Sequence, residues 1–146
     1  LGWRIHGPEV LALLQASGTA PGTIAEYDGR RVARGVPETG VELVPEETFI
    51  LEAGFERLNG VDFRKGCYVG QEVTARMKHK TDLKKRLVRV AVSGEAAPGT
   101  PIVTGEGKPA GTLFTQAGGA GLAHLRLDRA EGELAAGAAS VRYPVS

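Results

Sequence analysis

Short strand-like segments separated by glycine or proline dominate the chain beyond Lys84. A series of short strands with this punctuation is typical of a small sheet or barrel. We therefore expect residues 84–146 to form a small antiparallel β-barrel domain, with a domain boundary near Lys84. The expected strands are residues 87–92, 101–104, 111–116, 121–127 and 139–143.

A glycine-rich piece, Gly118-Gly119-Ala120-Gly121, lies between two of these segments. It has neither the Lys-Ser/Thr of a phosphate-binding loop nor the glycine spacing of a dinucleotide-binding turn. We therefore interpret it as a hairpin turn, with a phosphate cradle as the alternative.

Residues 1–83 combine helical and strand-like patterns, which makes the whole chain α+β. Proline near the start and glycine past the end favour a helix over residues 8–17. Thr23 and Glu26 have the spacing of a capping box, so a second helix is expected from Thr23 to about Gly35. Further expected elements are a helix from Pro45 that buries Phe49, Ile50 and Ala53, a helix over residues 71–78, and strands over residues 3–6 and 61–63.

The charges of the chain are balanced overall but unevenly distributed. The sequence has 18 Lys or Arg and 17 Asp or Glu among 146 residues, so the net charge is +1 and gives no general attraction to nucleic acid or anionic membrane. The basic residues cluster between residues 76 and 89, which offers an RNA-binding module as one alternative function. We expect instead a solvated helix face and linker without direct nucleic-acid binding, because no aromatic platform for stacking bases accompanies the charges.

The sequence contains neither a membrane-spanning pattern nor a secretion signal. No apolar run approaches the roughly 20 residues of a membrane-spanning helix, and no leader precedes a cleavage site. A single cysteine forms no intrachain disulfide, which agrees with a reducing compartment. We therefore expect a cytoplasmic protein without membrane contact. Because the chain starts at Leu1 rather than Met, we also expect it to be a piece of a longer protein.

The only cysteine, Cys67, lies in a segment that favours a reactive thiol. Thiols act as nucleophiles or metal ligands in the thiolate form, which positive charge and a helix N-terminus both favour. Arg64 and Lys65 precede Cys67, and the helix expected from Gln71 would direct its free N–H groups toward the loop. The alternative is that Cys67 is a small buried hydrophobe.

A metal site made by protein side chains alone is not expected. One cysteine cannot build a structural zinc or iron–sulfur site, and His6, His79 and His124 show no ligand spacing relative to it. We interpret His79 as a solvated helix position and His124 as a strand residue.

Residues 65–72, with the sequence Lys-Gly-Cys-Tyr-Val-Gly-Gln-Glu, resemble the signature of the YgfZ family. Residues 31–37 resemble the family's Arg-Ile-x-x-Gly-x-Pro pattern, residues 60–63 directly precede the signature, and Arg76 stands where the family usually has arginine. Members of this family are similar in fold to the glycine-cleavage T protein, a folate-dependent aminomethyltransferase.

The resemblance implies that residues 1–83 are the C-terminal part of a T-protein-like folate-binding fold, which is followed by the barrel. It also implies tetrahydrofolate as a cofactor and a role in assembling or repairing iron–sulfur clusters in client proteins, notably radical-SAM enzymes that modify tRNA. Cys67 corresponds to the family's critical thiol and Lys65 to its neighbouring lysine. The other implied site residues are Gly66, Tyr68, Gly70, Gln71, Glu72 and Arg76 in the motif, and Arg31 toward the cofactor.

One departure distinguishes the chain from true T proteins, which usually have Arg-Leu-Glu-Ala-Gly where residues 31–35 are Arg-Val-Ala-Arg-Gly. The methyl group of Ala33 cannot hydrogen-bond or stabilise an amine-bearing folate as a carboxylate can. We therefore expect a folate-linked accessory factor for iron–sulfur proteins, and an aminomethyltransferase is the second hypothesis.

Overall fold

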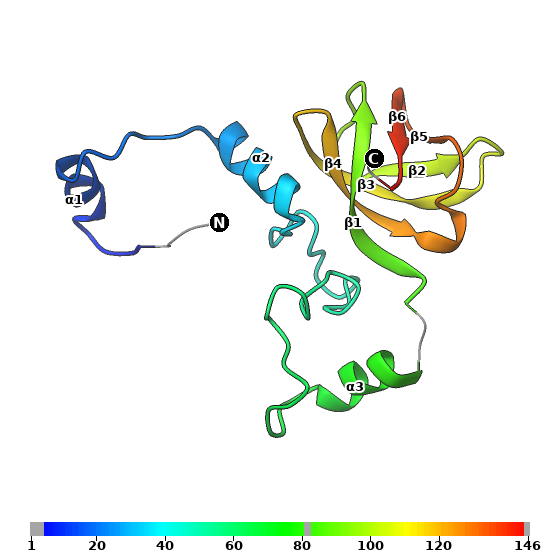
Figure 1. Cartoon of the computed structure of the whole chain (residues 1–146), viewed down its shortest axis with the longest axis horizontal. Helices are drawn as coiled ribbons and strands as arrows, with labels where there is room; N and C mark the ends of the chain where they lie inside the picture. Colours follow the sequence, from blue (N-terminus) through cyan, green and yellow to red (C-terminus); the bar gives the residue numbers. More distant parts are fainter. Residues whose placement is uncertain (1–4, 81–82, 145–146) are drawn as a thin grey trace.

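The C-terminal part of the chain is a closed antiparallel β-barrel of six strands in the order β1-β4-β3-β2-β5-β6 (Figure 1). The computed structural model describes residues 5–80 and 83–144. The barrel predicted from the strand punctuation is confirmed. Its strands are β1 (Lys85–Ser93), β2 (Thr100–Thr104), β3 (Pro109–Ala117), β4 (Ala120–Arg126), β5 (Leu134–Ala136) and β6 (Ala139–Arg142).

The interior of the barrel is filled by small and branched apolar side chains. Val90, Ile102, Leu113 and Leu125 are fully buried in one cluster that the strands share. Alternate residues of β4 serve two clusters, because successive side chains of a strand point to opposite faces. Ala123 and Leu125 point into the barrel, whereas Leu122 joins a smaller apolar cluster outside it.

The hairpin between β3 and β4 turns at Gly118 and Gly119. Ala117 pairs with Ala120, and the two glycines between them have φ angles of 59° and 75°. Left-handed conformations at both central residues are what a tight hairpin turn requires, and glycine adopts them without steric cost. The prediction of a hairpin turn is confirmed.

Strand β5 was missing from the prediction. Its three residues, Leu134, Ala135 and Ala136, carry no β-branched or aromatic side chain and alternate too briefly to give a strand pattern. They form a strand because they pair with β2 on one side and β6 on the other. This pairing closes the barrel.

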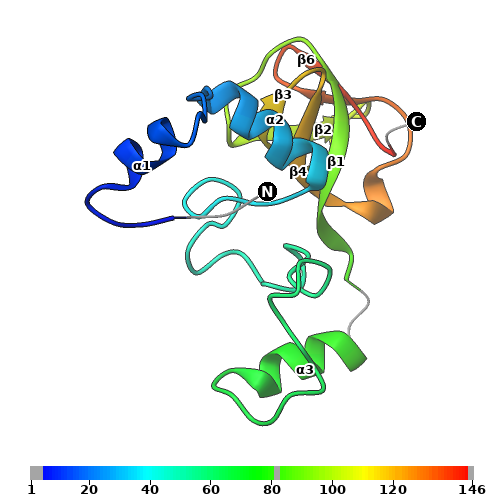
Figure 2. The ribbon, with the colours of Figure 1, turned by 60° about the vertical axis from the view of Figure 1, so that its left-hand side comes forward.

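Helix α2 (Ile24–Arg34) packs along the outer side of the barrel against β3 and β4 (Figure 2). The predicted capping box is present, since the Thr23 hydroxyl accepts from the Glu26 N–H and the Glu26 carboxylate accepts from the Thr23 N–H. The helix ends at Gly35 in a left-handed conformation with a φ of 62°. Val32 is buried against Leu122, whereas Ile24, in the first turn of the helix, is 77% exposed.

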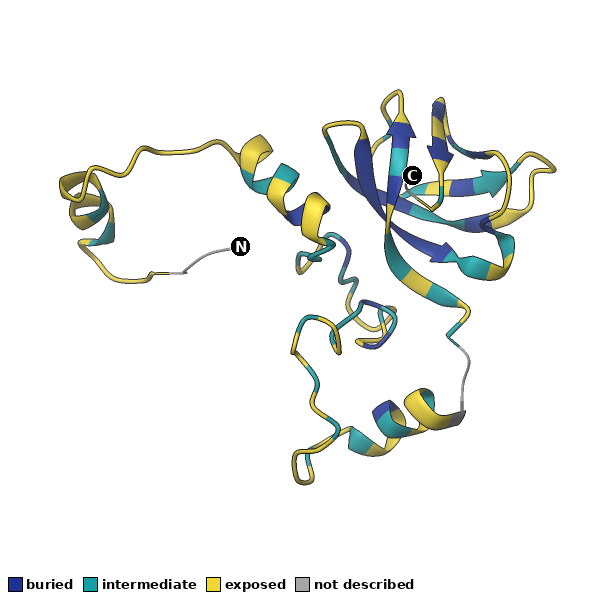
Figure 3. Cartoon of the chain, viewed as in Figure 1, coloured by how far each residue is buried: buried dark blue, intermediate teal, exposed yellow. Residues whose placement is uncertain are grey.

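Helix α1 (Val10–Ala16) forms where a helix was predicted, but it buries no side chain. Leu11 and Leu13 are both about two-thirds exposed, and Figure 3 shows this segment lying apart from the barrel. The strand predicted over residues 3–6 falls partly outside the described residues, and the described Ile5 and His6 belong to no strand.

The helix predicted from Pro45 does not form, and residues 45–59 run through successive turns. Glu46 adopts a φ of 64° and Asn59 a φ of 58°, left-handed conformations that interrupt a right-handed helix. The predicted buried face is also wrong in part, because Phe49 and Ile50 are exposed whereas Ala53 is buried.

The strand predicted over residues 61–63 is absent as well. The side chain of Asp62 accepts from the Arg64 N–H at 2.8 Å and turns the chain at this point. The third helix, α3 (Gln71–Lys80), begins where it was predicted. The barrel part of the predicted fold class is thus confirmed, and the T-protein-like nature of residues 1–83 remains a prediction. Within the described residues, no helix combines the length and apolar character needed to span a membrane.

Candidate functional site

The motif of residues 65–72 forms an exposed loop that leads into α3. Cys67 carries a free thiol on the surface of this loop. The alternative of a small buried hydrophobe is therefore wrong for Cys67. The structure places the motif residues together in this one loop and in the first turns of the helix.

Backbone hydrogen bonds join the motif loop to α3. The Gln71 N–H donates to the Tyr68 carbonyl oxygen, and both the N–H and the hydroxyl of Thr74 donate to the Gly70 carbonyl oxygen, each at 3.2 Å. Gly70 has a φ of 84°, so glycine allows the turn by which the chain enters the helix. The loop and the helix therefore form one local unit.

Lys65 and Tyr68, which stand on either side of Cys67 in the sequence, contact each other in space. The Lys65 ammonium lies 5.2 Å from the centre of the Tyr68 ring, within the range of a cation–π interaction. The Tyr68 hydroxyl is buried and has no hydrogen-bond partner within the structure. A positive charge and an aromatic ring thus flank the thiol in the sequence.

Glu72 and Arg76, one turn apart on the surface of α3, form an ion pair with their charged groups 2.8 Å apart. Both side chains are mostly exposed, so the pair contributes at most a few tenths of a kcal/mol, roughly 0.3–0.5. Val73 is 58% exposed, and Val69 is fully exposed. Two apolar side chains therefore stand free close to Cys67 in the sequence.

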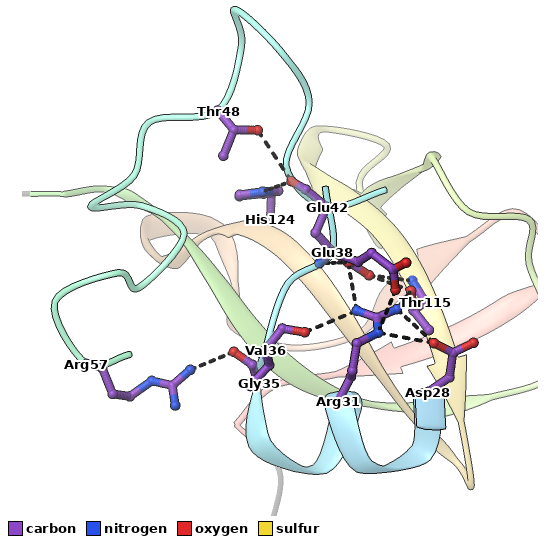
Figure 4. Close-up of polar contacts among 10 residues, drawn as sticks. All are labelled: Asp28, Arg31, Gly35, Val36, Glu38, Glu42, Thr48, Arg57, Thr115 and His124. Carbon is purple, nitrogen blue, oxygen red and sulfur yellow. Dashed lines mark hydrogen bonds and ion pairs between the residues drawn. The ribbon is translucent and has the colours of Figure 1, made fainter. Parts of the chain in front are cut away.

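Arg31 lies in a buried polar cluster between α2 and the barrel (Figure 4). The Arg31 Nε and Nη2 both donate to the Asp28 carboxylate, and Nη2 also donates to the Thr115 hydroxyl. Nη1 donates to the Glu42 carboxylate and to the Val36 carbonyl oxygen. A guanidinium has five N–H donors, and each of them is used here. Arg31 consequently offers no free donor to a folate, which does not fit the cofactor role implied by the resemblance.

Glu42 is the buried anion of the same cluster and is fully inaccessible to solvent. One carboxylate oxygen accepts from Arg31 at 3.0 Å and from the Glu38 N–H at 2.9 Å, and the other accepts from the hydroxyl and the N–H of Thr115. Burial alone would lower the pKa of the Arg31 guanidinium, but the carboxylates of Glu42 and Asp28 outweigh this effect and raise it. The cluster therefore fastens residues 36–42 to β3 through a buried ion pair and its hydrogen bonds.

The sequence did not single out Glu42 or Thr115 as important residues. Thr115 lies 84 residues from Arg31 and 73 from Glu42, so no local spacing connects them. The only sequence signal for this cluster was Arg31, which belongs to a recognisable motif. That motif implied a role in cofactor binding, whereas the structure gives Arg31 a role in the buried cluster.

His124 occupies a strand, as predicted, and its ring is 3% exposed on the outer face of β4. Its Nε2 lies 2.9 Å from the Glu42 carbonyl oxygen, so Nε2 carries the proton and donates. Its Nδ1 is buried and has no hydrogen-bond partner among the residues described by the structure. Burial lowers the pKa of His124, Lys85 lowers it further, and the Glu42 carbonyl opposes both effects.

We expect this histidine to make the folded state sensitive to acid. The folded-state pKa lies below the unfolded value, so the unfolded chain takes up a proton first as the pH falls below about 6.5. Stability present at neutral pH should then fall by up to about 1.4 kcal/mol per pH unit. Urea unfolding between pH 7.5 and 5.5 should show a shallower pH slope for His124→Gln than for the unaltered chain. The exposed His79 offers the matched control, and an equal change of slope in His79→Gln would contradict the assignment.

The basic residues between 76 and 89 are partly engaged with the protein itself. Lys78 contacts the Glu56 carboxylate at 2.6 Å, Arg76 pairs with Glu72, and the Arg86 Nε donates to the Leu83 carbonyl at 3.4 Å. No group of three or more His, Cys, Asp or Glu is arranged to hold a metal ion among the residues that the structure describes.

Among the clefts along the barrel, two lie next to the residues described above. One, of about 680 Å³, lies between α2 and the β3–β4 hairpin and includes Arg31 in its wall. The other, of about 710 Å³, lies between α3, residues 51–57 and the barrel, and it combines apolar walls such as Met77 with the charged Glu52 and Arg86. Burial raises the pKa of Glu52, and the nearby Lys85 partly opposes this effect.

Comparison with known proteins identifies the barrel. Residues 84–145 match the family described as the CAF17 C-terminal β-barrel domain. The barrel is similar to the CAF17 C-terminal domain. Relatives that extend over nearly the whole chain carry the name iron–sulfur cluster assembly factor IBA57, mitochondrial. The Mus musculus protein is 36% identical over 144 residues, and the Homo sapiens protein is 34% identical over 143 residues, each match covering 92% of this chain.

The chain spans about two fifths of the length of these two relatives, 39% in each case. An IBA57 homologue from Aspergillus fumigatus is 40% identical over 95 residues, which cover 65% of this chain and 20% of the homologue. These matches support the wider YgfZ/CAF17 family, to which IBA57 belongs, and do not single out YgfZ itself. The prediction of a cytoplasmic location is contradicted, because the relatives are named as mitochondrial proteins.

Proposed function

We propose that this chain belongs to an iron–sulfur cluster assembly factor in which the Cys67 thiolate is the working group. The observation that carries the proposal is the exposure of the free Cys67 thiol on the motif loop. Relatives that cover 92% of the chain are named as iron–sulfur cluster assembly factors. For its location, these names point to mitochondria.

The chemistry of the loop supports this role. Thiolate sulfur is a soft ligand for iron and a nucleophile toward sulfane sulfur, and exposure lets a client protein reach it. The neighbouring Lys65 and Arg64 are exposed cations that would attract an anionic cluster to the loop. A single thiol cannot complete a cluster site, so the client must supply the remaining ligands.

The finer parts of the proposal rest on the resemblance of residues 65–72 to the YgfZ signature. The proposed clients are radical-SAM enzymes that modify tRNA. The proposed cofactor is tetrahydrofolate. Because Arg31 has no free donor, folate binding in this chain would use other residues, and the cleft beside α3 has suitable polar and apolar walls. Folate contributes a one-carbon-carrying pterin, and this chain's residues would only bind and orient it.

An accessory role is favoured over aminomethyl transfer by the surroundings of Ala33. Ala33 is exposed on α2 and carries no acid. The carboxylates of Asp28, Glu38 and Glu42, which belong to the same region, lie within 3.1 Å of the Arg31 guanidinium. They are therefore committed to a structural ion pair.

Replacing Cys67 with serine is expected to abolish support for a client while leaving the fold intact, because the side chain is exposed and lies outside both apolar clusters. The measurement is the iron-to-protein ratio and catalytic activity of a radical-SAM client matured with the unaltered or Cys67→Ser protein. Circular dichroism and unfolding midpoints provide the control for folding. Full client activity with Cys67→Ser would refute the proposal, and methylene transfer to folate that survives in Cys67→Ala would favour the transferase.

A further inference from the structure

Lys78 connects the two ends of the motif loop to the rest of the protein. We propose that Lys78 is a positioning residue that, through Glu56 and Phe63, holds residues 63–72 in place and thereby sets the position of the Cys67 thiol. The inference rests on the proposed function for its biological meaning, because it assumes that Cys67 is the working group. Its structural content can be tested separately.

The contacts of Lys78 lie on the side of the loop that precedes Cys67. Its ammonium contacts both carboxylate oxygens of Glu56, at 2.6 and 2.7 Å, and lies 5.5 Å from the centre of the Phe63 ring. Phe63 is half-buried and stands four residues before Cys67 in the sequence. One ammonium therefore holds the start of the loop through a charge and an aromatic ring.

Lys78 itself belongs to the element that follows Cys67. It lies in α3, whose first turn is hydrogen-bonded to the loop through Thr74 and Gly70. The loop therefore leaves Phe63, passes Cys67 and returns through α3 to the same ammonium. Closing a short loop at both ends removes much of its conformational freedom, which is the physical requirement for presenting a thiol in one position.

The other partner of Lys78, Glu56, stands on a segment that is anchored to α2. The guanidinium of the adjacent Arg57 donates to the Arg34 carbonyl oxygen at 3.0 Å, at the C-terminus of that helix. It also donates to the Gly35 carbonyl oxygen at 2.6 Å (Figure 4). Helix α2 is in turn fastened to the barrel by the Arg31 cluster. Lys78 is thus the contact through which a series of polar interactions from the barrel reaches the motif loop.

Partial exposure suits a contact that positions a loop rather than one that holds the fold together. The Lys78 and Glu56 side chains are 41% and 49% exposed, so losing their pair should affect global stability little. Lys78 belongs to the basic stretch, but it is not free to bind phosphate because its ammonium group already contacts the Glu56 carboxylate.

The test uses the fact that Cys67 is the only cysteine, so a nitroxide label attaches to it without further engineering. In the whole chain, Lys78→Met is expected to raise the ratio of mobile to immobile nitroxide signal in room-temperature EPR about fivefold, because an ion pair and a cation–π contact are lost together. Lys78→Arg should retain the unaltered spectrum, and Glu56→Gln, which removes only the anion, should give an intermediate one. Lys108→Met is the matched control, because Lys108 forms a similar exposed pair with Glu106 at 2.7 Å on the barrel.

An unchanged spectrum in both Lys78→Met and Glu56→Gln would overturn the proposal, as would an equal change in Lys108→Met. Client maturation is the second measurement, and we expect Lys78→Met to lower it and Lys78→Arg to preserve it. Full maturation by Lys78→Met despite a mobile label would also overturn the positioning role. A Cys67→Ser protein that still matures the client would defeat the proposed function instead, while the EPR result for Lys78 would stand.

Discussion

Arg31→Met is expected to lower the free energy of unfolding by about 3–5 kcal/mol, because it leaves the fully buried Glu42 carboxylate without its cation. An uncompensated buried charge costs far more than the ion pair contributes, and Thr115 would also lose a hydrogen-bond donor. Chemical denaturation monitored by circular dichroism measures the effect. Arg34→Met, at an exposed position of the same helix, should change stability by no more than about 0.5 kcal/mol.

This substitution also separates a structural role from a cofactor role for Arg31. If the guanidinium bound folate, Arg31→Met would weaken folate affinity and leave stability almost unchanged. We expect the reverse, a large loss of stability, since every donor of Arg31 already has a protein partner. Unfolding midpoints and folate titration of the same two variants distinguish the outcomes.

Gly111→Ala should destabilise the barrel by about 3 kcal/mol, although it adds a single methyl group. A Cβ atom at Gly111 would lie 2.2 Å from the His124 carbonyl oxygen and 3.0 Å from the Leu125 Cα. Both atoms belong to the backbone of β4, which is paired with β3 at this point, so neither can move aside without disturbing the pairing. Equilibrium unfolding in urea would reveal the loss.

Gly29→Ala is the natural comparison for that substitution. Gly29 lies in the interior of α2, and a Cβ atom there would meet nothing within 4 Å. Alanine has the higher helix propensity, so Gly29→Ala should stabilise the protein by about 0.5–1 kcal/mol. Equal losses of stability at the two positions would mean that the close approach at Gly111 is not responsible.

Predictions based on local signals proved accurate where the deciding groups lie close together in the sequence. The capping box of Thr23 and Glu26 and the hairpin turn at Gly118 and Gly119 involve groups at most three residues apart. Their geometry follows from local backbone preferences, which tertiary contacts did not override.

Predictions failed where the outcome depended on long-range contacts. The pattern after Pro45 favoured a helix, but the chain turns at Glu46, and the Glu52 carbonyl oxygen instead accepts from the Leu87 N–H at 2.7 Å. Strand β5 exists only through its two neighbours in the barrel. In both cases the energy comes from residues that a local window does not contain.

For the candidate site, too, local features could be predicted from the sequence and long-range contacts could not. The residues around Cys67 were identified from eight consecutive positions, and their order along the chain already places a lysine, a tyrosine and a helix start beside the thiol. That the thiol is exposed, and that Lys78 reaches back to Glu56 and Phe63, depends on how α3 folds against the preceding turns.

Arg31 shows the difference most clearly. Its motif could be recognised from neighbouring residues, whereas its role is set by Glu42 and by Thr115, which lies 84 positions away. Composition, strand punctuation and capping signals were sufficient for the barrel and for α2, because these features act between neighbouring residues. The burial of an ion pair and the presentation of a thiol arise only when distant surfaces meet, because desolvation and packing belong to the assembled fold and to no single segment.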